Sequence, residues 1–156
     1  MSAPARPAII ASVFYRDPMA ALKWLEAAFG FELAELLVDS EGRLQHSEMR
    51  HGDGLFMVGG EWADWVRSPA GTGGANTQLL RVSLESDIDG HCARARAAGA
   101  VIEREPEDQF YGERNYMAVD PEGHHWVFGQ AVREVSIAEM EAATNMKFVK
   151  TELVDG

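Results

Sequence analysis

The chain has 156 residues, of which 46% are hydrophobic, and a formal net charge of −11 at pH 7. This length suits one globular domain, or two small ones sharing a core. The acidic charge argues against binding to nucleic acid or an anionic membrane surface, and no apolar run approaches the roughly 20 residues that a membrane-spanning helix needs. Cys92 is the single cysteine, so no disulfide can form within the chain. Because the first residues also lack the apolar core of a secretory signal, we expect a cytoplasmic protein.

The first half of the chain predicts a strand, a helix and three further strands. Residues 1–7 are small and Pro-rich, and we expect them to be frayed. An alternating apolar pattern predicts a strand over residues 9–15. Asp17 before Pro18 is typical of a helix start, and Gly30 of its end. Three more strands are predicted over 31–38, 44–50 and 55–59.

A connection follows over residues 61–77. Its second part, Ser68-Pro-Ala-Gly-Thr-Gly-Gly-Ala75, has the composition of a flexible linker. Its first part contains Trp62 and Trp65. We expect these tryptophans to form a local lid over the core, with the edge of a pocket as the alternative.

The second half repeats the order of the first. A strand is predicted over 78–84, then a helix that starts at Ser86-Asp87, ends at Gly99 and turns Ile88, Cys92 and Ala95 toward the sheet. Strands are predicted over 101–104, 116–119 and 125–128. The last two form a hairpin, because Asp120-Pro-Glu-Gly123 supplies a preset φ and a glycine that accepts positive φ.

Landmark residues in the two halves recur at nearly one spacing, which indicates an internal duplication. The pairs at 69 or 70 residues are Asp17 and Asp87, Gly30 and Gly99, Gly54 and Gly123, Val58 and Val127, and Gly60 and Gly129. Beyond the second half, Ser136-Ile-Ala-Glu139 predicts one more helix, with Ile137 and Met140 on its apolar side and its end near Asn145. We expect this helix to brace the core or a partner subunit.

Two βαβββ modules with Asp-Pro-x-Gly before the final strand resemble the vicinal oxygen chelate superfamily, which includes glyoxalase I, bleomycin-resistance proteins and extradiol dioxygenases. The matching segments are 15–31 and 108–129. The resemblance implies an α+β fold in which the tandem modules form an open, curved mixed sheet around a cavity, followed by a C-terminal helix. It also implies one domain over residues 1–131, with modules at about 8–60 and 78–130 joined by 61–77, and an extension over 132–156.

In metal-using members of this superfamily, each module supplies one ligand from its first strand and one from its last. Alignment through Asp17, Asp120-Pro-Glu-Gly123 and the repeat places these positions at Ile10, Met57 or its neighbour, Leu80 and Val127. Aliphatic and thioether side chains do not hold Mg²⁺, Mn²⁺, Zn²⁺ or Fe²⁺ in the ordinary way, and no residue beside these four offers a carboxylate or imidazole. We therefore expect neither the usual metal site nor another cofactor.

Strand alternation then assigns side chains to the cavity. This set is Ile10, Ser12, Phe14, Leu55, Met57, Leu80, Val82 and Val127, and by continuation His46, Glu48, Asn115, Met117 and His125. His46 and Glu48, two residues apart on one strand face, are candidates for an acid–base pair, with an exposed edge strand as the alternative. We call the hairpin of residues 116–128 the landmark hairpin. Three residues in or just before it, Tyr111, Arg114 and Tyr116, are candidates for covering a ligand. Asp87 and His91 could clip an ion, although a helix cap beside a surface histidine is favoured.

The favoured function is that of a metal-independent protein that encloses a small organic molecule, which the acidic charge would allow to be cationic. Its candidate ligand-binding residues are Ser12, Phe14, His46, Glu48, Met57, Tyr111, Arg114, Asn115, Met117 and His125. The resemblance implies a homodimer. One alternative is a metal-dependent lyase, isomerase or dioxygenase with a relocated metal site using His46, Glu48 or His125. A weaker alternative is a non-catalytic dimerisation or regulatory module.

Overall fold

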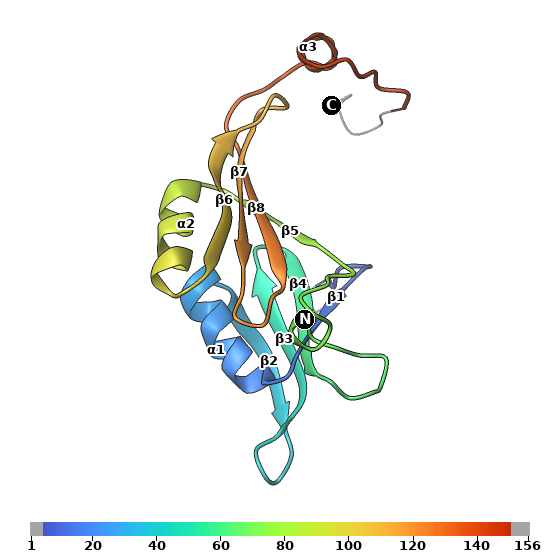
Figure 1. Ribbon diagram of the computed structural model, residues 1–156, viewed down its shortest axis with the longest axis vertical. Coiled ribbons are helices and arrows are strands. Elements are labelled where there is room, and N and C mark those ends of the chain that lie inside the picture. The colour runs from blue at the N-terminus through green and yellow to red at the C-terminus, as the bar shows by residue number, and fades with distance from the viewer. Residues whose placement is uncertain (1–4, 151–156) are drawn as a thin grey trace.

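The computed structural model describes residues 5–150 and builds them into two four-stranded sheets and three α-helices (Figure 1). The strand orders are β1-β4-β3-β2 and β5-β8-β7-β6. In each sheet the first two strands are parallel and the other pairs antiparallel. The strands are β1 (Ala11–Tyr15), β2 (Glu32–Val38), β3 (Leu44–His51), β4 (Gly54–Gly60), β5 (Leu80–Leu84), β6 (Val101–Asp108), β7 (Glu113–Val119) and β8 (His125–Ala131). The predicted α+β fold with two βαβββ units and an open sheet is confirmed.

One helix covers one face of each sheet, and the two helices lie side by side (Figure 1). Helix α1 (Pro18–Phe29) begins where the Asp17 carboxylate accepts a hydrogen bond from the Ala20 amide at 3.0 Å, and it ends at Gly30, whose φ is +71°. Helix α2 (Ile88–Ala97) begins at Asp87 in the same way. We call the face of each sheet that packs on its helix the helix face, and the other the open face.

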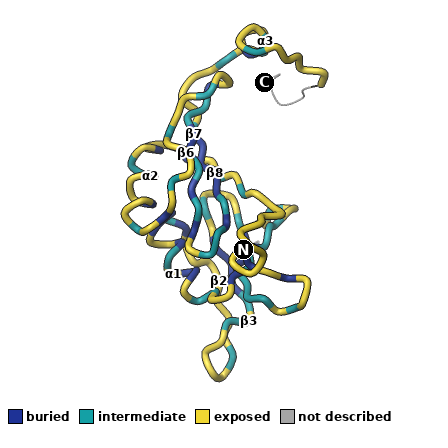
Figure 2. The backbone as a smooth tube through the Cα atoms, in the orientation of Figure 1, coloured by how far each residue is buried: buried dark blue, intermediate teal, exposed yellow. Residues whose placement is uncertain are grey.

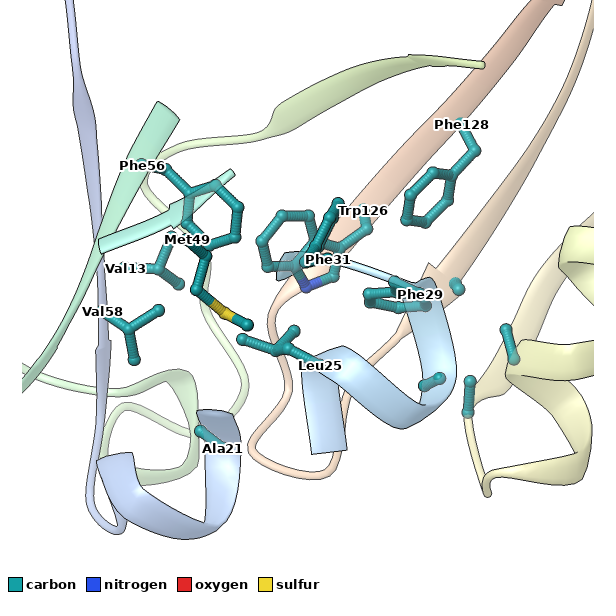
Figure 3. Close-up of a cluster of buried hydrophobic side chains, with 14 of the residues drawn as sticks. Val13, Ala21, Leu25, Phe29, Phe31, Met49, Phe56, Val58, Trp126 and Phe128 are labelled. Carbon is teal, nitrogen blue, oxygen red and sulfur yellow. The ribbon is translucent and has the colours of Figure 1, made fainter. Parts of the chain in front are cut away.

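The core is an aromatic cluster to which both modules contribute (Figure 3). The Trp126 ring lies 5.6 Å from Phe29, 5.5 Å from Phe31 and 5.6 Å from Phe56, measured between centroids. Phe128 packs on Phe29 at 4.7 Å. These rings are nearly inaccessible to solvent, and burying each side chain stabilises the fold by about 1.5–3 kcal/mol. Because the two sheets share this cluster, their helix faces point inward and their open faces point away from the core.

A buried polar contact also joins the modules. The Tyr15 hydroxyl donates to Asp120 Oδ2 at 2.6 Å, and Trp126 Nε1 donates to the same oxygen at 3.2 Å. Burial and the Asp120 carboxylate raise the pKa of Tyr15. Elsewhere, His91 Nε2 lies 2.9 Å from the Phe29 carbonyl, so Nε2 must donate and Nδ1 accepts from the Tyr116 hydroxyl at 2.6 Å. His91 is therefore a half-buried link between modules, and the favoured surface position was wrong.

The connection between modules is more ordered than its composition predicts. Val66 and Ser68 are buried, and a 3-10 turn, η1, spans Pro69–Gly71. Ser68 donates its amide to Glu61 at 2.8 Å, and the Asn76 side chain donates to the Gly123 carbonyl at 2.9 Å. The segment is thus attached to the landmark hairpin, and the prediction of a flexible linker was wrong.

The chain continues past β8 into an arm that carries α3 (Ile137–Ala143) beyond the β6–β7 turn and away from α1 and α2 (Figure 1). The Ser136 hydroxyl caps it by accepting from the Glu139 amide at 3.1 Å, as predicted. Met140 is buried, whereas most of the arm is exposed (Figure 2). The expected brace against the chain's own core is therefore not formed. Within residues 5–150, no helix is long and apolar enough to cross a membrane.

Candidate functional site

The open face of the first sheet carries the first group of predicted residues. Ser12 pairs with Met57, and Met57 pairs with Glu48, so these side chains share a face, while Val13, Phe56 and Met49 between them lie in the core. A cavity of about 450 Å³ opens on this face. Its lining includes Ser12, Phe14, His46, Met57 and Trp62.

A second cavity of about 510 Å³ adjoins the first, and Ser12 and Phe14 line both. The connection 65–78 bounds it on the other side, through Trp65 and Gln78 among others. Gln78 ties the connection to β1 by donating to the Ser12 carbonyl at 2.5 Å. The ordered connection thus forms the wall of a concave region.

Trp62 and Trp65 lie at the edges of these cavities. Their side chains are exposed and contact each other edge to face, with ring centroids 5.0 Å apart. They do not cover the core as a lid. They line the cavities instead, in agreement with the alternative prediction of a pocket edge. Sequence reasoning left both out of the candidate site. Two large apolar rings in an otherwise polar loop were the signal that could have included them.

Glu48 is the buried charge of this face, with a relative exposure of 5%. Arg6 holds it with two hydrogen bonds, Nη2 to Oε1 at 2.6 Å and Nη1 to Oε2 at 3.1 Å. His46 Nε2 lies 3.2 Å from Oε1, and Glu35 lies 3.9 Å from the same histidine nitrogen. Hydrogen bonding from Arg6 is the main cause that lowers the pKa of Glu48. Arg6 falls within the residues that were predicted to be frayed: residues 5–7 form no helix or strand, and the described structure gives them this contact with Glu48.

The open face of the second sheet has a different character, because a hydrogen-bond network centres on buried Asn115. Its amide donates to the Tyr111 hydroxyl at 2.8 Å and to Glu113 at 3.1 Å. Its carbonyl oxygen accepts from Arg104 at 2.7 Å. Arg81 pairs with Glu113. These groups are bonded to one another and hold Asn115 in one orientation.

His125 and Met117 lie on the same open face and line a third cavity of about 480 Å³ with Leu79 and Gln78. His125 Nδ1 lies 2.7 Å from Glu103. The structure therefore places His125 on the second sheet and the His46–Glu48 pair on the first.

Two of the predicted cover residues lie on the helix face instead. Tyr116 is fully buried against Phe128, and Arg114 pairs with Asp89 and Asp108 at 3.0 Å. Alternation along β7 explains this, because Asn115 occupies the opposite face. Only Tyr111 of the three reaches the open face, through its bond to Asn115.

The assignment of Leu80 and Val82 to the cavity was also wrong. Leu80 pairs with Trp126 and packs on the core, and Val82 pairs with Phe128. Arg81 pairs with Val127 as Ser12 pairs with Met57, so Leu79 is the counterpart of Ile10. The alignment failed because the second module has one more residue between strand and helix.

The four positions to which the resemblance assigns metal ligands are therefore Ile10, Met57, Leu79 and Val127. None has a side chain that fits a divalent ion. Among residues 5–150, no three His, Cys, Asp or Glu side chains gather in a way that could hold a metal.

Comparison with known proteins agrees with this architecture. The chain is 31% identical over 151 residues to an uncharacterized protein of Mycobacterium tuberculosis strain H37Rv, covering 92% of this chain and 85% of that protein. The crystal structure of TioX from Micromonospora sp. ML1 matches with a TM-score of 0.65 and 33% identity over 80% of this chain and 98% of TioX. TnmS3, an antibiotic binding protein from Streptomyces sp. CB03234, shares the fold, with a TM-score of 0.59 and 21% identity over 83% of this chain and 99% of TnmS3. The family model for the Glyoxalase/Bleomycin resistance protein/Dioxygenase superfamily matches residues 8–128, and the chain belongs to this superfamily.

Proposed function

We propose that this protein binds a small organic molecule, without a metal, in the adjoining cavities on the open face of its first sheet. The observation that carries the proposal is the pair of cavities of about 450 and 510 Å³ that share Ser12 and Phe14. Small-ligand sites usually have volumes of roughly 300–1,000 Å³, mainly apolar walls and a few polar groups. Met57, Phe14 and the two tryptophans supply apolar surface here, but the walls are mixed in polarity, because Ser12, His46, Gln78 and other polar residues also line them.

The exposed tryptophans favour a ligand with a flat ring. An aromatic ring gains burial and stacking on an indole, and such pairs contribute about 0.5–1.5 kcal/mol beyond the buried area. TnmS3 is described as an antibiotic binding protein and has the same fold, which supports the class of function without naming a ligand.

We further propose that a second copy of the chain completes the site as a homodimer. Every residue of the edge strand β2 is exposed, including Leu33, Leu36, Leu37 and Val38. An exposed apolar edge strand is a surface that proteins usually cover. Sedimentation at several concentrations tests this part. We retain the cytoplasm as the proposed compartment, because Cys92 is a free, buried thiol.

Ligand binding is tested by screening a panel of aromatic antibiotics, including metal-free bleomycin, by thermal shift on protein treated with EDTA. We expect at least one compound to raise the melting temperature. Replacing Trp62 or Trp65 by Ala should weaken its binding by about tenfold. Phe148→Ala is the matched control, because it removes an exposed ring on the arm. Binding that requires added metal and is lost in His46→Ala would contradict the proposal and favour the enzyme with a relocated metal site.

A further inference from the structure

The contact between Arg6 and Glu48 has an unusual arrangement for a structural ion pair. One partner is a strand residue fixed in the sheet, with 5% of its surface exposed. The other belongs to residues 5–9, which form no helix or strand, and its own side chain is 54% exposed. Within the described structure, residues 5–9 make two hydrogen bonds, both from Arg6 to Glu48. A fixed, buried acceptor is thus paired with a loosely attached donor.

The buried carboxylate needs a cation. A carboxylate that loses water is costly unless it is paired and hydrogen-bonded, and removing one partner of such a pair leaves an uncompensated charge. His46 supplies a single contact, between its Nε2 and Glu48 Oε1 at 3.2 Å. Among residues 5–150, Arg6 alone contacts both oxygens, in the bidentate geometry that planar guanidinium and amidinium groups share.

Two neighbours of the Glu48 carboxylate line the cavity of the proposed function. Met57, its cross-strand neighbour, and His46, its hydrogen-bond partner, both line the 450 Å³ cavity. A molecule in that cavity could place a cationic group on Glu48 if Arg6 moved away. The aromatic pair at the cavity edge would then contact the apolar part of the same molecule.

We propose that Glu48 is the anchor for a planar cationic group of the ligand, and that residues 5–9 are a displaceable plug whose Arg6 occupies this anchor in the free protein. This inference rests on the proposed function, since it names the ligand class of the same site. A tethered competitor acts at an effective concentration in the millimolar range for a short flexible tether. A simple cation therefore competes poorly, and a ligand must gain further affinity from the cavity.

The experiment measures binding of p-aminobenzamidine, an aromatic amidinium, by calorimetry to the wild type, Arg6→Gln, Arg6→Lys and the double variant Arg6→Gln/Glu48→Gln. We expect Arg6→Gln to bind about tenfold or more tightly than the wild type, because a hydrogen-bonded charge pair no longer competes. Arg6→Lys keeps the positive charge but loses the bidentate geometry of the guanidinium. Its affinity for p-aminobenzamidine should lie between those of the wild type and Arg6→Gln. The double variant should lose the gain, and neutral p-aminobenzamide should not distinguish the proteins.

Equal affinity of wild type and Arg6→Gln for the amidine, including equal absence of binding, would overturn the plug. An equal gain for the neutral amide, or a gain that survives Glu48→Gln, would overturn the anchor. If Arg6→Gln is unstable, the comparison of wild type with Arg6→Lys decides in the same way. Binding of a neutral aromatic compound that depends on Trp62 tests the cavity separately, so this inference can fail while the proposed function stands.

Discussion

Replacing Tyr15 by Phe tests the contact that joins β1 to the landmark hairpin. The hydroxyl of this fully buried residue donates to Asp120 Oδ2 at 2.6 Å. Hydrogen bonds to charged groups contribute about 1.5–3 kcal/mol. Asp120 keeps the Trp126 indole and two backbone amides as donors after the change, so no carboxylate oxygen loses all its partners. We therefore expect the low end, a loss of about 1.5 kcal/mol in the free energy of unfolding.

Asp120→Asn should cost more. Oδ1 must continue to accept from the amides of Glu122 and His124, so the new amide group faces the Tyr15 hydroxyl and the Trp126 indole. The Tyr15 hydroxyl can turn to accept from this amide, but the buried indole N–H then faces a donor and loses its acceptor. The expected loss is about 3 kcal/mol or more.

Urea unfolding at fixed protein concentration, followed by tryptophan fluorescence, measures both losses. The double variant supplies the coupling energy, which should be about 1 kcal/mol, because Tyr15→Phe removes little once Asp120 is gone. A stability of Tyr15→Phe within about 0.5 kcal/mol of the wild type, the range of ordinary surface changes, would refute the reasoning.

Three further predictions concern other parts of the fold. Gly123→Ala should lower the free energy of unfolding, measured in urea, more than Gly42→Ala does. Both glycines have positive φ, which costs about 1–2 kcal/mol for alanine. A Cβ at position 123 would in addition lie 3.2 Å from Pro69 Cβ, whereas the space at position 42 is open. Stability should begin to fall as pH drops below 6.5, because burial lowers the pKa of native His91 and the unfolded chain binds a proton that the native state does not. The stability of His91→Gln, measured by unfolding curves, should depend less steeply on pH just below 6.5. Cys92 should not react with a thiol reagent until the protein is unfolded, because burial covers the thiol and raises its pKa; rapid labelling of the native protein would contradict this.

Local sequence chemistry predicted the elements well where one residue decides the backbone. Asp17 and Pro18 start α1, Gly30 ends it in the left-handed conformation, and Asp120-Pro-Glu-Gly123 turns the final hairpin. Each of these depends on sterics and hydrogen bonds within a few residues. Strand ends were less predictable, and β6 runs four residues beyond Arg104 because pairing with β7 continues past an irregularity in register.

The face assignments show where sequence reasoning failed. The repeat was treated as rigid, but the second module places Asp87 in a left-handed conformation one residue later than Asp17. One added residue reverses the faces of a whole strand, which moved Leu80 and Val82 into the core. The face assignments in the first module were unaffected by this shift, and Ser12, Phe14 and Met57 line the cavity.

The long-range parts of the candidate site were beyond prediction. The pairing of Arg6 with Glu48 spans 42 residues, and nothing in a short Pro-rich segment indicates which carboxylate it will contact. The connection is similar, because its glycines and serine suggest mobility, while burial of Val66 and the bond from Asn76 to Gly123 fix it. Such contacts depend on the packing of the modules and not on local composition.

The shared aromatic cluster has a consequence for the joining of the two modules in one chain. Phe29 and Phe31 come from the first module, and Trp126 and Phe128 from the second, so neither half could bury its rings alone. A single βαβββ unit with these rings would need a second copy to cover them. Joining the two units in one chain replaces a contact that depends on protein concentration by one at an effective concentration in the millimolar range or above. The open faces are free of this constraint and differ, the first carrying the Arg6–Glu48 pair and the second the Asn115 network.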